Sequence, residues 1–521
     1  MKLLSAAQIR QGDAYTIARE PVSSIGLMER AAARCAVSVT EGFAACRYLV
    51  MVCGPGNNGG DGLAMARLLQ PFFDEVRVYC FGDPAKRSAD FTVNDFRLRE
   101  KGIIPQTLSP SDTPDEFLRT LSRPGTVIGD ALFGTGLSKP VTDDYFGSVI
   151  EAVNGSGMPV FSVDIPSGLS ADEGRHAEKN ARVVRAAVTY TFELPKRAFL
   201  FAENAPYTGR VEVVSVGLHR DFMETVDTTE FLITRSGVSE LRKPAGTFSH
   251  KGTYGHALVL GGSKGKPGSV LLATRACMAS GAGLTTACTP ETVGPVIGQQ
   301  APEAMGMTAG GDYLSGRPEW PAGITALGIG VGMGREKETA DLLKQCIAEA
   351  DLPMVWDADA LNILSENKTW LSFLPPDTIL TPHPKEFDRL TQPHETGHAR
   401  WRTQMEFSRK YGVYVVLKGA HTSVTTPLGK TFFNTTGNPG MATGGSGDVL
   451  TGILTGLLAQ GYPPVDTCLL GVYVHGLAGD LAFAEKGREA LVASDIILRL
   501  GQAFLSVFEN DYIHWSRNLT A

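Results

Sequence analysis

The segment from Asn438 to Asp448 has the residues of a phosphoryl-transfer site. It reads Asn-Pro-Gly-Met-Ala-Thr-Gly-Gly-Ser-Gly-Asp and precedes an apolar helical pattern that begins at Val449. Glycines let the backbone approach a phosphate closely, and N–H groups at a helix start can hold charge on a transferring phosphoryl group. Asp448 can take the proton of an attacking hydroxyl. The plainer alternative is a capping turn with Asp448 as the cap, but five small residues before one aspartate are more than capping needs.

Three polar strand ends in the second half of the chain fit the same pocket. The segments 357–362, 381–386 and 418–422 each follow a predicted strand. The last of them, Lys-Gly-Ala-His-Thr, could wrap a nucleotide. His383 has no second His or Cys at ligand spacing on its element, so we expect it to hydrogen-bond the substrate rather than bind a metal. The glycine- and lysine-rich segment 261–268 lacks the spacing of a Walker A loop.

A second glycine-rich turn, residues 54–62, joins a strand to a helix near the N-terminus. It reads Gly-Pro-Gly-Asn-Asn-Gly-Gly-Asp-Gly, and such a turn presents free N–H groups and the positive end of a helix dipole. Its first glycines also match the G-x-G-x-x-G of dinucleotide-binding turns, a match that alone does not establish a dehydrogenase. The two asparagines and the aspartate add side-chain groups that a plain dinucleotide turn does not need.

Two further strand ends carry polar residues, around Asp130 and Asp164. Ligands of open parallel sheets bind at the carboxyl ends of strands. Asn58, Asp130 and Ser167 could therefore converge as oxygen ligands of a monovalent or hard cation. Asp164 and Lys139 could act as an acid/base pair. The alternative is that Asp130 and Asp164 cap the following helices.

The elements that must position these residues alternate between strand and helix in both halves of the chain. Short β-branched runs separated by helical patterns predict parallel sheets covered by helices on both faces. The runs 187–192 and 211–216 look like edge strands. Between 218 and 247 the pattern weakens, and we place a boundary near residue 225. The predicted fold class is thus α/β with two doubly wound domains, residues 1–224 (Rossmann-like) and 225–521.

The composition argues against charge-driven partners. The 521 residues carry a formal net charge of −7, and no block of like charges occurs, which is unfavourable for nucleic-acid or membrane-surface binding. The eight cysteines form no Cys-x-x-Cys pair. No apolar run approaches the ~18 residues of a membrane span, and the first residues lack the apolar core of a signal peptide. We therefore expect a cytoplasmic protein with reduced thiols.

The first half of the chain resembles the YjeF N-terminal family, the NAD(P)H-hydrate epimerases. The resemblance rests on Leu-Met-Glu-Arg-Ala at 27–31, the 54–62 loop, Asp-Ala-Leu-Phe-Gly-Thr-Gly at 130–136 and Asp-Ile-Pro-Ser-Gly at 164–168, and it covers roughly residues 1–220. It implies that Asn58, Asp130 and Ser167 bind potassium. It also implies that the hydrated nicotinamide nucleotide is bound by Asn57, Asn58, Gly59, Gly60, Asp61, Gly134, Thr135, Gly136, Leu137, Ser138, Lys139, Pro140 and Asp164.

The second half resembles the ribokinase-like superfamily and, within it, the ADP-dependent NAD(P)H-hydrate dehydratases. Five blocks match in order, from Lys-Gly-Thr-Tyr-Gly-His-Ala at 251–257 to Gly-Gly-Ser-Gly-Asp at 444–448. The chain departs at 330–334, where Gly-Val-Gly-Met-Gly replaces the usual Gly-Pro-Gly-Leu-Gly, and at Ser446, where threonine is commoner. The implied substrate contacts are Ala257, Gly332, His383 and Asp448. The implied contacts to the adenine nucleotide are Lys418, Gly419, Ala420, His421, Thr422 and Gly447.

Together the two resemblances imply repair of hydrated nicotinamide nucleotides. The first domain would interconvert the R and S hydrates of NADH and NADPH (NADHX and NADPHX), and the second would dehydrate the S form with ADP and magnesium, giving AMP and phosphate. The choice of ADP over ATP rests on the resemblance alone. A ribokinase-type kinase of a small alcohol, and a non-catalytic nucleotide-binding scaffold in the first half, are the alternatives. Enzymes of this kind are commonly homo-oligomers, and we expect one here.

Overall fold

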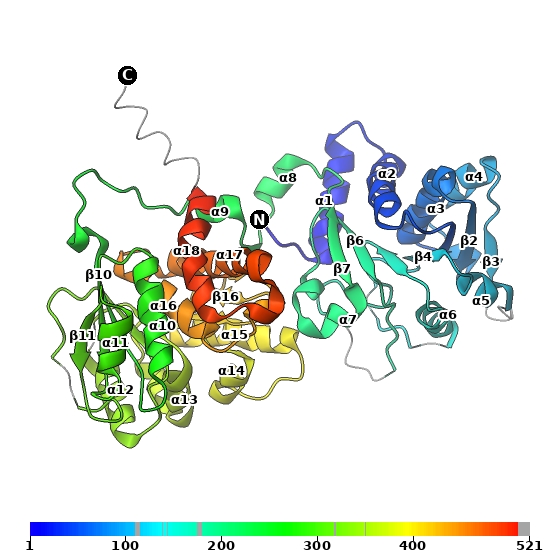
Figure 1. The fold of residues 1–521 in the computed structure, drawn as a ribbon. Coiled ribbons are helices and arrows are strands. Elements are labelled where there is room, and N and C mark those ends of the chain that lie inside the picture. The colour runs from blue at the N-terminus through cyan, green and yellow to red at the C-terminus, as the bar shows by residue number, and fades with distance from the viewer. Residues whose placement is uncertain are drawn as a thin grey trace. The chain divides into compact units, whose positions relative to one another are not determined.

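A computed structural model describes residues 1–109, 115–137, 139–142, 144–174, 180–316, 319–349 and 351–508. The chain forms two compact α/β units (Figure 1). The N-terminal unit comprises Lys2–Thr228 and Thr396–His398, and the C-terminal unit comprises Met1, Thr229–Glu395 and Ala399–Ala521. Ser138, one of the predicted substrate-binding residues, lies outside the described residues.

The N-terminal unit is built on a seven-stranded parallel sheet with the order β3-β2-β1-β4-β5-β6-β7. The strands are β1 (Tyr48–Cys53), β2 (Glu75–Phe81), β3 (Gln106–Leu108), β4 (Thr126–Ala131), β5 (Val160–Val163), β6 (Val188–Phe192) and β7 (Arg210–Val214). The helices are α1 (Ala6–Arg19), α2 (Ser24–Gly42), α3 (Asn57–Leu69), α4 (Ala89–Glu100), α5 (Asp115–Leu121), α6 (Asp144–Gly155), α7 (Ala205–Thr208) and α8 (Arg220–Thr225). The strand order reverses between β1 and β4, the place where ligands of doubly wound sheets bind.

Successive side chains of each strand point to opposite faces of the sheet, so the apolar core of the N-terminal unit has two halves, one on each face. Leu49 and Met51 of β1 pack with α2, α3 and α4, whereas Val50 and Val52 pack with α5 and α6. Because successive side chains of a strand point to opposite faces, a strand buried on both faces is apolar throughout, as β1 is.

The prediction that 187–192 is an edge strand is wrong, whereas β7 does lie at the edge of the sheet. β6 pairs with β5 on one side and β7 on the other. Its alternating threonines mimic a half-exposed strand, yet Thr189 and Thr191 are fully buried. The Thr189 hydroxyl donates to the Thr208 carbonyl at 2.7 Å, which offsets the cost of burying it.

The C-terminal unit is built on a ten-stranded sheet with the order β11-β10-β9-β12-β13-β14-β15-β16-β17-β8. The strands are β8 (Glu230–Leu232), β9 (His256–Leu260), β10 (Leu284–Thr289), β11 (Met305–Thr308), β12 (Ala326–Ile329), β13 (Met354–Trp356), β14 (Ile379–Leu380), β15 (Tyr414–Leu417), β16 (Ser423–Thr425) and β17 (Thr431–Phe433). The helices are α9 (Arg235–Ser239), α10 (Pro267–Ala279), α11 (Gly294–Gln300), α12 (Lys337–Glu349), α13 (Ala358–Glu366), α14 (Pro384–Leu390), α15 (Gly397–Tyr411), α16 (Ser446–Ala459), α17 (Pro464–Ala490) and α18 (Ala493–Phe508). Only the pairings of β16 with β15 and β17 are antiparallel.

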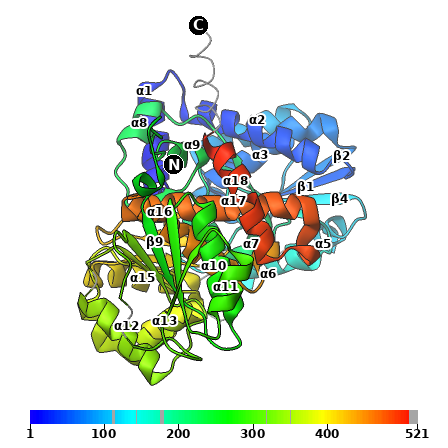
Figure 2. The same ribbon diagram turned by 60° about the vertical axis from the view of Figure 1, so that its left-hand side comes forward.

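Helices cover both faces of this sheet as well (Figure 2). Ala257 and Val259 of β9 pack with α10, α16, α17 and α18, whereas Leu258 and Leu260 pack with α12 and α13. The helix α16 is buried along nearly its whole length, so its first turn is held rigidly at the carboxyl end of the sheet. Both units thus have the doubly wound architecture that the sequence predicts.

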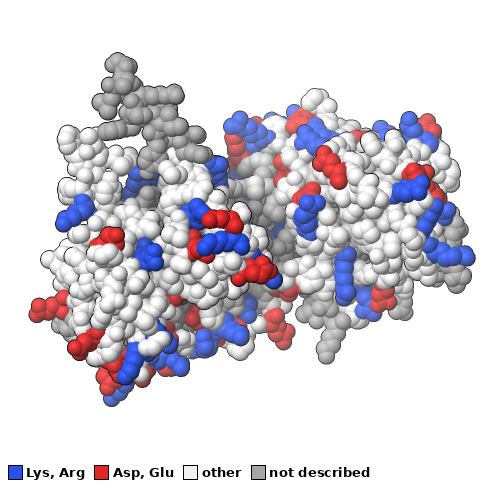
Figure 3. Space-filling view, in the orientation of Figure 1, with Lys and Arg blue, Asp and Glu red and all other residues white. Residues whose placement is uncertain are grey.

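One helix of the described chain, α17, is long and apolar enough to cross a membrane by length and composition. Its most apolar window is 61% buried, and α17 packs against α16 and α18, which is typical of a core helix. On the face shown in Figure 3, acidic and basic side chains are interspersed without a large patch of one sign.

Candidate active sites

The glycine-rich turn after β1 forms the start of α3. Gly56 is the N-cap of α3 and offers no side-chain cap to the first N–H groups. A Cβ on Gly54 would lie 1.9 Å from the Leu132 carbonyl oxygen, and one on Gly59 would lie 1.8 Å from the Gly54 carbonyl oxygen. The glycines therefore allow the turn to pack directly on the end of β4. The uncapped N–H groups remain available to an anion.

A cavity of about 690 Å³ opens beside this turn. Of the predicted substrate-binding residues, those that line it are Asn57, Asn58, Asp61, Gly134, Thr135, Gly136, Leu137, Lys139 and Asp164. Gly59 and Gly60 are buried in α3 and do not line it, and neither does Pro140. The strand ends after β1, β4 and β5 thus meet at one cavity.

Asp164 forms an ion pair with a lysine that the sequence analysis did not single out. Its Oδ1 lies 2.7 Å from Nζ of Lys196, and it also accepts a hydrogen bond from the Phe192 N–H at 3.0 Å. The Lys196 side chain is only 1% exposed, and Nζ donates further to the carbonyls of Phe192 and Leu194. Lys139 lines the same cavity but is exposed, and no hydrogen bond or ion pair joins it to Asp164. The available signal was that Lys196 follows β6 at the same edge of the sheet.

Asp164 does not cap a helix, and its backbone is strained. Its φ of 68° lies in the left-handed region, which a non-glycine residue rarely adopts. Such strain persists where the surroundings fix the residue, as the Lys196 ion pair does, and it gathers at functional sites.

Asp130 and Ser167 meet in the interior, as the cation-site prediction requires. Oδ1 of Asp130 accepts from the Ser167 hydroxyl at 2.5 Å, and Oδ2 accepts from the Ser167 N–H at 2.9 Å and from the Ser162 hydroxyl at 2.8 Å. Burial raises the pKa of Asp130, and the Ser167 hydrogen bonds oppose that rise. Asp130 makes no ion pair with any described residue, so its charge has no protein cation nearby.

Asn58 is the third residue of the predicted cation site. Its Nδ2 is buried and has no hydrogen-bond partner among the described residues. Since amide O and N are assigned from their partners, a turned amide would direct a carbonyl oxygen into that position. A carboxylate, a hydroxyl and an amide oxygen are hard ligands that suit such a cation. The described residues contain no cluster of three or more His, Cys, Asp or Glu of the kind that holds a transition metal.

The C-terminal loop lies at the start of α16, and Asp448 is not its cap. The N-cap is Gly445, with a φ of 91° that favours glycine, and it makes no side-chain cap hydrogen bond. Asp448 lies inside the first turn. The capping alternative is therefore wrong. The Ser446 N–H donates to the Thr443 carbonyl at 3.4 Å, whereas those of Gly445, Gly447 and Asp448 have no partner among the described residues and are available to an anion.

The half-buried Asp448 carboxyl lies beside a lysine–aspartate pair. Burial, followed by the charge of Asp357, raises the pKa of Asp448 to about 6, while a Ser269 hydrogen bond and Lys418 oppose the rise. Nζ of Lys418 lies 2.7 Å from Oδ1 of Asp357, whose Oδ2 accepts from the Thr451 hydroxyl at 2.7 Å. Asp448 itself makes no ion pair with a described residue. A carboxyl with a pKa of about 6 is ionised at neutral pH and can still accept a proton during a reaction.

A cavity of about 810 Å³ adjoins the loop. It is lined by the predicted residues His383, Lys418, Gly419, Ala420, His421, Thr422, Gly447 and Asp448. Gly332 does not line it but packs on Ser269, the hydrogen-bond partner of Asp448. Ala257 is fully buried in β9 and is not in the lining.

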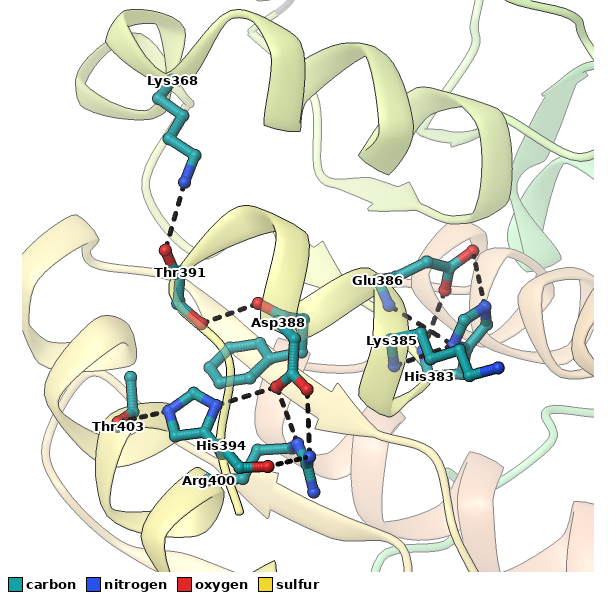
Figure 4. A network of polar contacts seen from close by, with 10 residues as sticks. Lys368, His383, Lys385, Glu386, Asp388, Thr391, His394, Arg400 and Thr403 are labelled. Carbon is teal, nitrogen blue, oxygen red and sulfur yellow. Dashed lines mark hydrogen bonds and ion pairs between the residues drawn. The ribbon is translucent and has the colours of Figure 1, made fainter. Parts of the chain in front are cut away.

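His383 caps α14 and is neutral. Its Nδ1 accepts from the N–H groups of Lys385 at 3.1 Å and Glu386 at 3.3 Å, while the Glu386 carboxylate accepts from the His383 N–H (Figure 4). Burial lowers the pKa of His383. With Nδ1 occupied as an acceptor, Nε2 carries the proton and lies 3.4 Å from Oε1 of Glu386.

Figure 4 also shows a Thr403–His394–Asp388 series that resembles a nucleophilic triad. Both ring nitrogens of His394 are used, with distances of 2.8 Å to Asp388 and to Thr403. Arg400 pairs with the same aspartate, and the His394 side chain is 3% exposed. None of these side chains lines either cavity, so the series fixes the connection between α14 and α15.

Two side chains of α17, which the sequence analysis missed, hold the loops of the C-terminal cavity. Nε2 of His475 lies 3.0 Å from the Ser446 carbonyl, and burial lowers the pKa of His475 to about 4, so the neutral ring donates this bond. Asp480 accepts from the Gly437 N–H at 3.0 Å and the Asn438 amide at 2.9 Å. They could not be located from spacing, because α17 looks like any apolar core helix.

Two family models match the chain, one in each half. Residues 257–500 match a family model described as NAD(P)H-hydrate dehydratase, and residues 24–198 match one described as YjeF-related protein N-terminus. A bifunctional NAD(P)H-hydrate repair enzyme of Moorella thermoacetica is 35% identical over 511 residues, 95% of each chain. One of Coxiella burnetii is 36% identical over 95% of this chain and 97% of its own.

Solved structures cover the C-terminal unit. The ADP/ATP-dependent NAD(P)H-hydrate dehydratase of Bacillus subtilis, co-crystallised with ATP and Mg²⁺, is 30% identical, covering 53% of this chain and 98% of its own with a TM-score of 0.46. The full-length sequence relatives carry the family assignment, because they match both units in one chain. The chain belongs to the family of bifunctional NAD(P)H-hydrate repair enzymes.

Proposed function

We propose that the N-terminal cavity interconverts the R and S hydrates of NADH and NADPH, and that the C-terminal cavity dehydrates the S hydrate at the expense of an adenine nucleotide. The family supports the two activities. The observation that carries the assignment of the second is Asp448, a half-buried carboxyl without an ion-pair partner among the described residues, at the uncapped start of α16.

The dehydration follows from the leaving groups involved. Hydroxide leaves carbon poorly, whereas phosphate leaves well. Asp448 takes the proton of the hydroxyl on the hydrated ring carbon, and the oxygen attacks the terminal phosphoryl group of the nucleotide, whose bond to the bridging oxygen breaks and releases the nucleotide with one phosphate fewer. The lone pair of the ring nitrogen then expels phosphate, and loss of a proton from the neighbouring carbon restores the double bond. The N–H groups at 445–448 stabilise charge on the phosphoryl group in transit.

Lys418 and the residues after it are the proposed nucleotide contacts. The ammonium of Lys418 is held by Asp357 at the cavity wall, and a Cβ on Gly447 would lie 3.2 Å from it. The ammonium and the glycine backbone therefore approach the same space, where a phosphate would accept hydrogen bonds from both. Magnesium, bound with the nucleotide, would neutralise its phosphates.

In the N-terminal cavity, Asp164 is the proposed proton-transfer residue, and Asn58, Asp130 and Ser167 are the proposed potassium ligands. The three ligands lie at the ends of β1, β4 and β5, so a cation held by them would fix the loops that line the cavity. Its charge would also balance the buried Asp130 carboxylate.

One experiment tests both activities. The purified protein receives a mixture of R and S hydrates with ADP or ATP in separate tubes, and the absorbance of reduced nicotinamide is followed. We expect complete recovery with ADP. Recovery of the S fraction only would refute the epimerase, and a stable phosphorylated alcohol without recovered absorbance would identify a small-molecule kinase instead.

A further inference from the structure

The N-terminal cavity contains a carboxyl that the proposed function does not use. Asp13 lines the cavity together with Asp61, Asp164 and Glu193. It makes no hydrogen bond or ion pair with a described residue, whereas Asp164 is paired with the buried Lys196. Among the carboxyls of this cavity, Asp164 is therefore fixed by an ammonium, and Asp13 is held by no described side chain.

The first helix fixes Asp13 in this place. Ser5 and Gln8 form a capping box at the start of α1. Gly12 lets α1 approach α8 so closely that a Cβ would lie 2.8 Å from the Phe222 ring. One turn later the Thr16 hydroxyl accepts from the His219 N–H at 2.9 Å. Contacts on both sides of Asp13 thus hold it toward the cavity, although it is more than 150 residues from Asp164 in sequence.

The two carboxyls have different surroundings. Asp164 is held by the Lys196 ammonium at 2.7 Å, whereas Asp13 has no such partner among the described residues. Burial, then the charge of Asp164, raises the pKa of Asp13 to about 6, with Lys196 opposing and Glu193 adding to the rise. A substrate that covers the cavity would bury Asp13 further and act in the same direction. Two carboxyls in one cavity with such different surroundings are suited to act as an acid and a base.

Resting on the proposed epimerase function, we infer that Asp13 is the acid that works with Asp164 as base in the interconversion of the two hydrates, and that Lys196 is the positioning residue of Asp164. Lys139, in this assignment, contacts the nucleotide rather than the reacting ring. The buried position of Lys196 supports the division, because its ammonium is already used by Asp164 and two carbonyls.

Opening the bond between the ring nitrogen and a ring carbon that bears a hydroxyl requires one base and one acid. The Asp164 carboxylate takes the hydroxyl proton, the C–O bond becomes a carbonyl, and the C–N bond breaks with its electron pair moving to nitrogen. Asp13 gives its proton to that nitrogen. After rotation about the adjacent C–C bond, nitrogen attacks the other face of the carbonyl, Asp13 takes its proton back, and Asp164 returns the other to oxygen. No oxidant, reductant or other reactant is consumed.

The test is the Asp13→Asn variant of the full-length protein. Asparagine has nearly the same shape but cannot donate or accept a proton in this way. We expect kcat for conversion of the purified R hydrate to fall about 100-fold or more, with KM little changed, because general acid–base groups contribute roughly 10²- to 10⁴-fold. Dehydration of the purified S hydrate by the same sample should be unchanged. Asp221→Asn, the same change at an exposed carboxyl of α8, should leave both rates intact.

Three outcomes separate the inference from the function on which it rests. Normal R conversion by Asp13→Asn would overturn the inference alone, while absence of R conversion in the unaltered protein would refute the epimerase function. If the asparagine variant does not fold, the Asp13→Glu variant provides the test, because it keeps a carboxyl at this position. R-hydrate conversion by Asp13→Glu that is well above that of Asp13→Asn supports the assignment, whereas equally low conversion overturns it. The positioning role of Lys196 is tested in the same assay. Lys196→Arg should retain conversion of the R hydrate, whereas Lys196→Met should lose it, and KM should be unaffected in both variants.

Discussion

The two cavities pair a lysine with an aspartate in opposite ways. In the N-terminal unit the lysine is the buried partner, with Lys196 1% exposed and Asp164 12% exposed. In the C-terminal unit the aspartate is buried, with Asp357 2% exposed, and Lys418 keeps 21% of its side chain exposed. The buried ammonium of Lys196 is used by Asp164 and by two backbone carbonyls, whereas that of Lys418 is partly exposed and can reach a ligand.

The difference matches the chemistry proposed for each cavity. Moving protons between a hydroxyl and a ring nitrogen requires a fixed base and an acid, and no free cation. Moving a phosphoryl group requires a cation at the phosphates and a carboxyl left unpaired, which is the condition of Asp448. The predictions below test whether the two pairs differ in this way.

The largest expected effect is the loss of dehydration in Asp448→Asn. Removal of a general base should lower kcat for the S hydrate by roughly 10²- to 10⁴-fold. R-to-S conversion, measured by separating the epimers, should be unaffected. Asp312→Asn, an exposed carboxyl of the same unit paired with Lys264, is the matched control. Dehydration at the normal rate in Asp448→Asn would contradict the assignment of the base.

The second prediction concerns stability. Lys196→Met leaves the Asp164 carboxylate buried and unpaired, which should destabilise the N-terminal unit by about 3–5 kcal/mol. Hydrogen exchange of the β5 and β6 amides in the full chain measures this loss. Lys418→Met should cost the C-terminal unit less, since water from the cavity can reach the site. Equal losses in the two units would remove the proposed distinction between the pairs.

The third prediction concerns the nucleotide. Lys418→Met should weaken nucleotide binding by about 1.5–3 kcal/mol, the value of a hydrogen bond to a charged group, or roughly 10- to 150-fold in Kd. Titration calorimetry measures it, and Lys264→Met, an exposed lysine of the same unit, is the control. Unchanged affinity would show that Lys418 serves Asp357 alone.

The smallest expected effect is the pH dependence of dehydration. Asp448 acts as a base only when ionised, and its pKa is raised to about 6. The rate should therefore be constant above that pH and fall as the pH drops, to roughly a tenth of its maximum one unit below. Steady-state kcat for the S hydrate between pH 5 and pH 8 would show the fall, and a flat profile would rule out this titration.

The sequence was most informative where function depends on a single turn. The loops at 54–62 and 444–448 were located from composition, because a glycine-rich strand-to-helix turn is a local feature whose N–H groups point the same way in any such fold. The convergence of Asp130 with Ser167 could be expected from strand ends alone. The edge position assigned to β6 was wrong, because alternating threonines do not distinguish exposure from burial with hydrogen bonds.

The partners of the reactive groups could not be read from spacing. These partners come from unrelated segments. Lys196 follows a strand at the same edge of the sheet, but no neighbouring residues mark Asp13, Ser269 or His475. Each acts only because packing brings it beside Asp164, Asp448 or Ser446. Long-range proximity and burial then set their charges.

The sequence by itself determined the class of fold, the family and the turns that approach substrate, because strand and helix periods and turn residues are local properties. Only the tertiary structure decided which lysine neutralises Asp164, which carboxyls remain unpaired and how far their pKa values move. These properties depend on desolvation and on distances between charges, and both arise only when distant segments pack together.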